Sequence, residues 1–174
     1  MSSLIIFDVD GTLTPFRQGS TGRFEQRLLP NVKEVCARLR ASGHILALAS
    51  NQGGAAPSKP GRLTIGAVHS HLRWVAREVG ASAYRFAISS DRKKPSPSML
   101  VELMREFGVT PASTIFIGDA DNNAQAAAAV GCTFVWAKDF FKVARRYAAH
   151  PRGRDHCRFN SYTRNSAGEG RASN

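Results

Sequence analysis

Short apolar runs alternate along the chain with longer segments in which apolar residues recur every three to four positions. Residues 4–8 are apolar throughout until the final acid, as expected of a central parallel strand buried on both faces. Residues 98–107 instead place Met99, Val101 and Leu103 largely inward on an amphipathic helix that Gly108 ends. On these patterns we predict strands at residues 4–8, 45–50, 84–88, 114–118 and 132–136, and helices at residues 31–40, 65–79, 98–107 and 122–130.

Strands that alternate with helices at this spacing predict an α/β fold. We expect a Rossmann-like parallel sheet with crossover helices on both faces. In such sheets, ligands bind beyond the carboxyl ends of the strands, so the functional residues should lie where the predicted strands end.

Composition separates the end of the chain from the rest. The formal net charge is +11 over 174 residues, and residues 137–174 hold nine Lys and Arg against three Asp and Glu. Residues 151–174 are nearly devoid of apolar side chains and cannot form a core. We therefore predict one domain at residues 1–145 and a basic, flexible tail at residues 146–174. The tail is expected to be solvated; a nucleic-acid-binding arm is the alternative for Arg152, Arg154, Arg158, Arg164 and Arg171.

Several protein classes do not fit this sequence. The three cysteines, Cys36, Cys132 and Cys157, are widely separated and odd in number, which favours reduced thiols over a disulfide framework. The longest apolar runs are far too short to span a membrane, and no basic segment precedes the acid at position 8. We expect a cytoplasmic protein without membrane partners.

Two of the predicted strands lead into acidic residues. Asp8-Val9-Asp10-Gly11-Thr12 places two carboxylates at a tight turn, where both can face one cleft and Gly11 allows the backbone to approach a ligand. Gly118-Asp119 begins an oxygen-rich segment that suits a hard cation such as Mg²⁺. These residues supply a carboxylate nucleophile, a carboxylate for proton transfer and a metal ligand.

Two further segments supply groups for phosphate. Ser50 and Asn51 follow the second strand with a hydroxyl and an amide, and Lys94 is a cation beside Pro95. Thr12 joins Ser50, Asn51 and Lys94 as a candidate phosphate-binding residue. The whole inventory fits phosphoryl transfer through an aspartyl-phosphate intermediate.

These segments resemble the haloacid dehalogenase superfamily, whose motifs occur here in the family's order. Ser50-Asn51-Gln52-Gly53 and Lys93-Lys94-Pro95-Ser96-Pro97 are similar to the capless subclass III group of histidinol, heptose-bisphosphate and polynucleotide 3'-phosphatases. The resemblance covers about residues 3–140. It implies Asp8 as nucleophile and Asp10 as general acid and base. It also implies Ser50 and Lys94 as phosphate ligands, and Mg²⁺ held by the side chains of Asp8 and Asp119 and the main-chain carbonyl of Asp10.

The sequence departs from the family pattern at two places. Asn123 stands where the subclass often has a second Asp, which keeps an oxygen but removes a charge. Residues 87–93 contain no Cys or His, so we expect no zinc site of the kind found in the sugar and histidinol phosphatases. Asp121 could compensate for Asn123, but a helix N-cap is an equally good interpretation.

We therefore expect a Mg²⁺-dependent phosphomonoester hydrolase without a large cap domain. An open site suits a bulky substrate or closure by a partner chain, and Arg17, Arg23 and Arg92 are candidates for substrate contact. The alternatives are a polynucleotide 3'-phosphatase, a phosphotransferase, and a non-catalytic phosphate-binding module. The substrate is thus expected to be a phosphorylated small molecule or a nucleic-acid 3' end.

The remaining distinctive side chains have structural interpretations. His69 and His71 lie two positions apart on a helix, which makes them a poor metal pair and favours surface positions. The aromatic side chains could form a base-stacking platform, although packing is the better interpretation. They are Trp74, Trp136, Phe140 and Phe141.

Overall fold

Five parallel strands pair in the order β3-β2-β1-β4-β5 in the computed structural model, which describes residues 2–16, 24–57 and 63–148. The central strand β1 pairs with β2 on one side and β4 on the other, so Leu4 lies opposite both Ile45 and Thr114. All four residues of β1 are buried. The strands are β1 (Leu4–Phe7), β2 (Ile45–Asn51), β3 (Ala83–Ala87), β4 (Thr114–Gly118) and β5 (Thr133–Trp136).

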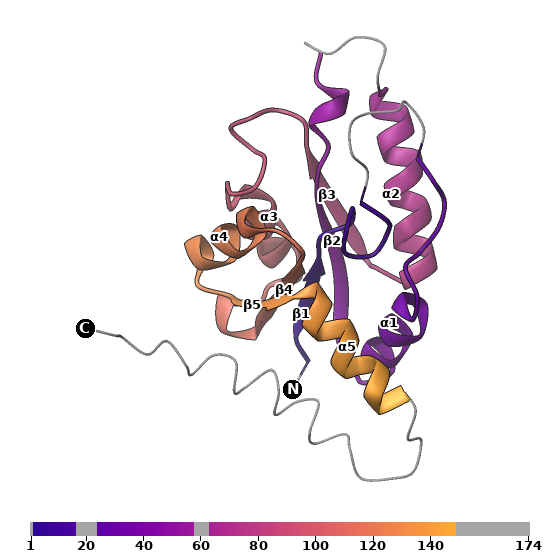
Figure 1. Cartoon of the computed structure of the whole chain (residues 1–174). Coiled ribbons are helices and arrows are strands. Elements are labelled where there is room, and N and C mark those ends of the chain that lie inside the picture. Colours follow the sequence, from indigo (N-terminus) through magenta and orange to yellow (C-terminus); the bar gives the residue numbers. More distant parts are fainter. Residues whose placement is uncertain (1, 17–23, 58–62, 149–174) are drawn as a thin grey trace, which may run out of the picture.

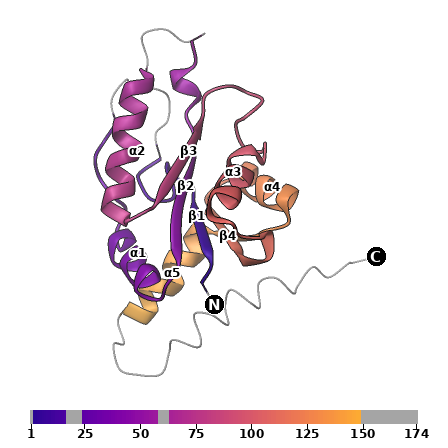
Figure 2. The ribbon, with the colours of Figure 1, turned by 180° about the vertical axis from the view of Figure 1, so that it is seen from behind.

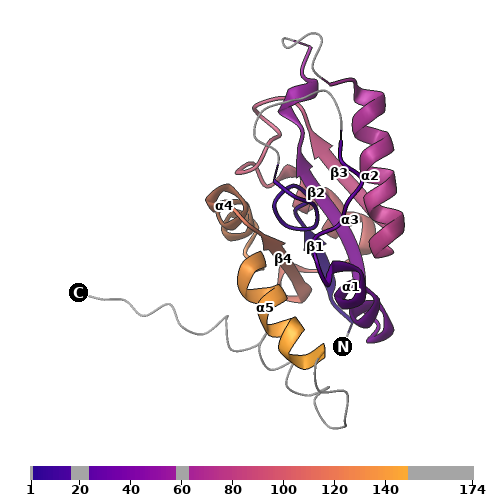
Figure 3. The same cartoon turned by 45° about the vertical axis from the view of Figure 1, so that its right-hand side comes forward.

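Helices cover both faces of the sheet (Figures 1 and 2). One apolar cluster joins the sheet to α1, α2 and α5, and a second cluster joins its other face to α3 and α4. Figure 3 shows α5 beside α1. The helices are α1 (Val32–Ala41), α2 (Ile65–Val79), α3 (Ser98–Phe107), α4 (Asp121–Val130) and α5 (Ala137–Ala148), with short 3₁₀ turns at Gly53–Ala55 and Pro111–Ser113.

The predicted fold class is confirmed, and every predicted strand and helix is present to within a residue or two. Two side-chain predictions are wrong. Val101 is exposed rather than inward, because Leu100 occupies the buried face of α3. His71 is buried rather than on the surface, because the Phe24 ring stacks on it with a centroid separation of 4.1 Å.

Helix α5 was not among the predicted elements. It follows β5 directly and buries Phe140, whose ring meets Phe7 edge to face at a centroid distance of 6.1 Å. The packing interpretation of this aromatic residue is thus confirmed. Since α5 extends to Ala148, it crosses the predicted domain boundary after residue 145. Residues 149–174, with the arginines of the predicted tail, lie outside the described residues.

The described residues between β1 and α1 form no cap domain over the sheet. In the same part of the chain that the structure describes, no helix combines the length and the apolar character needed to cross a bilayer. The predicted functional residues lie at or beyond the carboxyl ends of the strands.

Candidate active site

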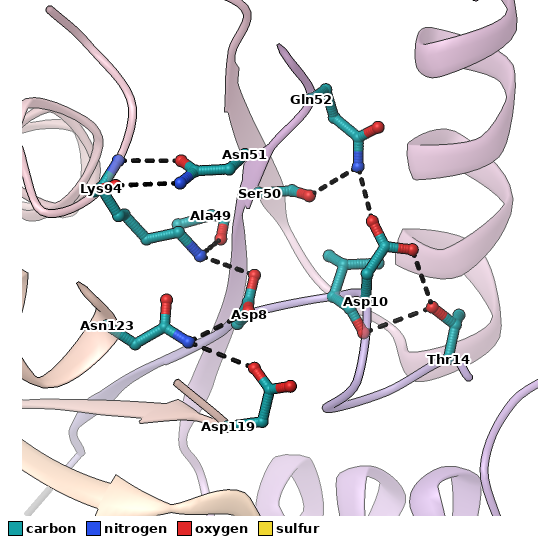
Figure 4. A network of polar contacts seen from close by, with 11 residues as sticks. Asp8, Asp10, Thr14, Ala49, Ser50, Asn51, Gln52, Lys94, Asp119 and Asn123 are labelled. Carbon is teal, nitrogen blue, oxygen red and sulfur yellow. Dashed lines mark hydrogen bonds and ion pairs between the residues drawn. The ribbon is translucent and has the colours of Figure 1, made fainter. Parts of the chain in front are cut away.

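Side chains from the ends of strands and from the loops after them meet at the carboxyl edge of the sheet (Figure 4). Asp8 follows β1, Ser50 is the next-to-last residue of β2, and Asp119 follows β4. Lys94 comes from the loop between β3 and α3. Because parallel strands end at the same edge, residues separated by more than a hundred positions converge on one site.

The centre of the site is a buried ion pair between Asp8 and Lys94. The Nζ of Lys94 donates to Oδ1 of Asp8 at 2.6 Å and to the carbonyl oxygen of Ala49 at 2.8 Å. The Lys94 side chain is 1% exposed, and its ammonium lies 5.4 Å from the centroid of the Phe116 ring. With so little water to screen it, this cation is held beside the carboxylate in a fixed position.

The backbone of Lys94 is fixed by Asn51. The N–H of Lys94 donates to Oδ1 of Asn51 at 2.8 Å, and Nδ2 of Asn51 donates to the carbonyl oxygen of Lys94 at 3.0 Å. Both polar atoms of the amide are thus committed to the loop that carries the cation. These bonds show Asn51 positioning the Lys94 loop, and a direct contact of Asn51 with phosphate stays a prediction.

Asp10 lies on another side of the site and is held by Gln52. The Nε2 of Gln52 donates to Oδ2 of Asp10 at 2.8 Å and to Oγ of Ser50 at 2.8 Å. Thr14 adds a long hydroxyl contact of 3.5 Å to Oδ1 of Asp10. One amide therefore links the predicted general acid to the predicted phosphate-binding hydroxyl.

Gln52 belongs to the motif Ser50-Asn51-Gln52-Gly53 but is not among the predicted site residues. The 3₁₀ turn that follows it, Gly53–Ala55, begins where β2 ends. A polar side chain directly after a buried strand was the available signal, but nothing in the sequence gave its direction. The side chain is 2% exposed and is directed toward Asp10 rather than into solvent.

Asn123 bridges Asp8 and Asp119, the two carboxylates predicted to bind Mg²⁺. Its Nδ2 donates to Oδ2 of Asp8 at 3.1 Å and lies 3.4 Å from Oδ1 of Asp119. The side chain is fully buried, and among the described residues its Oδ1 has no hydrogen-bond partner. Partial burial and the neighbouring Asp8 carboxylate raise the pKa of Asp119 to about 6, against the weaker opposing effect of Lys94.

The donor set at this point suits Mg²⁺. Within the described residues no cluster of three or more acidic, His or Cys side chains is formed, and the side chain of Asp10 is directed to Gln52. Asp8 and Asp119 nevertheless lie together, and a Cβ placed on Gly11 would fall 2.0 Å from Oδ2 of Asp119. The loop of residues 8–12, which is the predicted catalytic loop, therefore passes directly against this carboxylate. Mg²⁺ commonly binds one or two carboxylates and completes its coordination with water and phosphate oxygens.

A tight turn after β1 sets the backbone conformation of Gly11 and Thr12 in the segment of residues 8–12. The carbonyl oxygen of Val9 accepts bonds from the N–H groups of Thr12, Leu13 and Thr14 at 3.2, 2.8 and 3.0 Å. Gly11 has φ +83°, a left-handed conformation that a side chain would strain. Thr12 is 1% exposed, and its hydroxyl has no partner among the described residues. A phosphate contact for Thr12 stays a prediction.

Of the three candidate substrate arginines, the structure describes only Arg92. Arg17 and Arg23 lie outside the described residues. Arg92 forms an ion pair with Glu102 of α3, so its guanidinium is directed to that helix.

Comparison with known proteins places this arrangement in a family. The family described as haloacid dehalogenase-like hydrolase matches residues 22–131. The chain is 29% identical over 144 residues to a D-glycero-beta-D-manno-heptose-1,7-bisphosphate 7-phosphatase of Pseudomonas aeruginosa, covering 78% of this chain and 81% of the relative. It is 34% identical over 113 residues to a phosphoglycolate phosphatase of Haemophilus influenzae, covering 63% of this chain but only 44% of the relative.

A solved structure supports the same fold. A D,D-heptose 1,7-bisphosphate phosphatase from B. bronchiseptica, solved with magnesium and phosphate, superposes with a TM-score of 0.66 at 24% identity over 76% of this chain and 78% of that one. The family match covers more than half of the chain and spans both β2 and β4, whose ends carry Ser50 and Asp119. The chain belongs to the haloacid dehalogenase-like hydrolases.

Proposed function

We propose that this chain is a Mg²⁺-dependent phosphatase that hydrolyses phosphomonoesters of small molecules through an aspartyl-phosphate on Asp8. The observation that carries the proposal is the buried pair in which Lys94 Nζ lies 2.6 Å from Oδ1 of Asp8. A cation fixed beside a carboxylate can bind the phosphate oxygens that this carboxylate must approach. The names of the phosphatase relatives support the same reaction class.

In the first half-reaction, a carboxylate oxygen of Asp8 attacks phosphorus and the bond from phosphorus to the leaving oxygen breaks. Lys94 binds the negative oxygens of the transferring group, and Asp10 gives its proton to the leaving oxygen. Gln52 keeps Asp10 in place through its 2.8 Å bond. When bound at Asp8 and Asp119, Mg²⁺ supplies positive charge that offsets the repulsion between carboxylate and phosphate.

In the second half-reaction, Asp10 accepts a proton from water while the water oxygen attacks phosphorus of the aspartyl-phosphate. The bond to Asp8 breaks, and inorganic phosphate and the free carboxylate form. Asp10 is then protonated again, ready for another turnover. Its position apart from Asp8, next to Gln52 and Thr14, gives it access to both the leaving oxygen and the attacking water.

Hydrolysis of para-nitrophenyl phosphate, with and without Mg²⁺, tests the proposal. Asp8→Asn should lower kcat by about 10³-fold or more, because the nucleophile is lost. Glu34→Gln, which changes an exposed acid on α1, should leave kcat unchanged. Equal rates for wild type and Asp8→Asn would refute the proposal.

A second experiment tests the covalent step. Asp10→Asn should slow hydrolysis of the intermediate, so that ³²P from a labelled substrate stays attached to acid-quenched protein. The label should be absent from Asp8→Asn. The basic tail, one of the features behind the alternative of a nucleic-acid 3' end as substrate, lies outside the described residues, so that alternative stays a prediction.

A further inference from the structure

A pocket of about 320 Å³ lies beside the proposed catalytic residues and is not used by the mechanism above. It shares Asp119 with the site, and Gly11 and Thr12 form part of its wall. Its volume falls within the range of pockets that bind small ligands. A molecule seated in it would therefore lie against the catalytic loop.

The far wall of the pocket is apolar and aromatic. Leu29 comes from the segment that leads into α1, Trp136 ends β5, and Phe141 belongs to α5. Leu29, Trp136 and Phe141 are all partly exposed, so each leaves surface for a ligand. An apolar or planar ring of a ligand would pack against these side chains and remove their apolar surface from water, which is favourable.

Among the described residues that line the pocket, Lys138 is the one cation. Its Nζ lies 5.7 Å from the centroid of the Trp136 ring, and no acidic side chain of the described residues pairs with it. Lys138 stands at the start of α5, in the first turn, where the helix dipole also favours negative charge. The cation and the helix N-terminus together suit an anionic group attached to the ring of a ligand in the pocket.

The position of the pocket indicates which part of a substrate it would hold. The pocket meets the site at Gly11, Thr12 and Asp119, whereas the Asp10 carboxylate is directed to Gln52 and does not line it. For a phosphomonoester whose phosphate lies beside Asp8 and Lys94, the organic part beyond the phosphate is the leaving group, and the pocket is the adjacent space with room for it. We propose that the pocket binds the leaving group of the substrate, and that this group has a ring with an apolar face and carries an additional anionic group. The assignment of the pocket to the leaving group rests on the proposed function, whereas the binding of a ligand to the pocket can be measured without catalysis.

The binding experiment compares two leaving groups, phenol and 4-hydroxybenzoate, which differ by one carboxylate. We expect wild type to bind 4-hydroxybenzoate about fivefold to tenfold more tightly than phenol in calorimetric titration. Lys138→Met should abolish that preference. Lys142→Met, the same change one helical turn further along α5, should keep it. Trp136→Leu should weaken binding of both compounds about fivefold.

The kinetic experiment uses the matching substrates, phenyl phosphate and 4-carboxyphenyl phosphate. Lys138→Met should raise KM for the carboxylated substrate alone, about fivefold to tenfold, and leave kcat for both unchanged. Circular dichroism melting of each variant confirms that it is folded. If 4-hydroxybenzoate binds wild type no more tightly than phenol, or if Lys138→Met keeps the preference, the inference is overturned. If binding is as expected but neither ester is hydrolysed, the pocket assignment stands and the proposed function fails.

Discussion

Asn51 holds the backbone of Lys94 through two hydrogen bonds, one to its N–H at 2.8 Å and one to its carbonyl oxygen at 3.0 Å. The two residues are separated by 43 positions, yet the amide joins the end of β2 to the loop before α3. These two bonds fix the backbone position of Lys94, and that position decides whether its ammonium reaches Asp8. The position of the Lys94 ammonium therefore depends both on the loop between β3 and α3 and on Asn51.

Asn51→Ala should lower kcat for para-nitrophenyl phosphate by about 10-fold to 100-fold, because Lys94 loses its fixed position. If Asn51 acts only through Lys94, the same change should have no further effect in Lys94→Met. Steady-state kinetics of the two single variants and the double variant measure this. An additional loss in the double variant would mean that Asn51 contacts the phosphate itself.

The pair of Lys94 and Asp8 should show strong coupling in stability. Lys94→Met leaves the largely buried Asp8 carboxylate without its cation, and we expect it to cost about 3–5 kcal/mol of unfolding free energy. Adding Asp8→Asn removes the unpaired charge, so the double variant should recover much of that loss. Urea unfolding of wild type, both single variants and the double variant provides the cycle. Additive effects would contradict a close buried pair.

Apart from α5, the sequence was sufficient to predict the strands and the α-helices, because the apolar periodicity of this chain is regular. Helices 65–79 and 98–107 have the predicted bounds, and Gly80 and Gly108 end them in left-handed conformations. The convergence of Asp8, Lys94 and Asp119 also followed from position alone, since parallel strands share one carboxyl edge.

Side-chain direction could not be predicted in the same way. Asn51 and Gln52 are adjacent amides after one strand, but one is directed to the backbone of Lys94 and the other to Asp10. His71 has the polarity of a surface residue, and only the tertiary position of Phe24 buries it. Such contacts depend on neighbours distant in sequence, which periodicity does not reveal.

Asn123→Asp should change the response of the protein to Mg²⁺. The amide now donates to Asp8 and lies near Asp119, whereas an acid there would add a third carboxylate to a crowded site. We expect the metal-free variant to melt several degrees below wild type, by about 4–8 °C. Mg²⁺ should then raise Tm more in the variant than in wild type, because it neutralises the added charge.

Differential scanning calorimetry with EDTA and with Mg²⁺ measures both effects. Asp121→Asn, which alters an exposed acid two residues away in the first turn of α4, is the matched control and should leave the Mg²⁺ response nearly unchanged. If Asn123→Asp melts like wild type without metal, the amide does not relieve repulsion between the carboxylates.

Cys36 should make stability fall at alkaline pH. Burial in the core raises the pKa of this thiol from 9.0 to about 12, with Arg40 opposing the shift weakly. Above pH 9 the unfolded chain therefore loses the thiol proton while the folded chain keeps it, so the folded state is progressively disfavoured as pH rises from 9 to 12. Between pH 7.5 and pH 10, ionisation of this thiol in the unfolded chain should lower the unfolding free energy by about 1.4 kcal/mol. Cys36→Ala should be free of that loss, whereas Val35→Ala, a neighbouring core truncation without a thiol change, should lose as much as wild type. Urea unfolding at the two pH values decides the matter, and an equal pH dependence in Cys36→Ala and wild type would show that the thiol ionises within the fold.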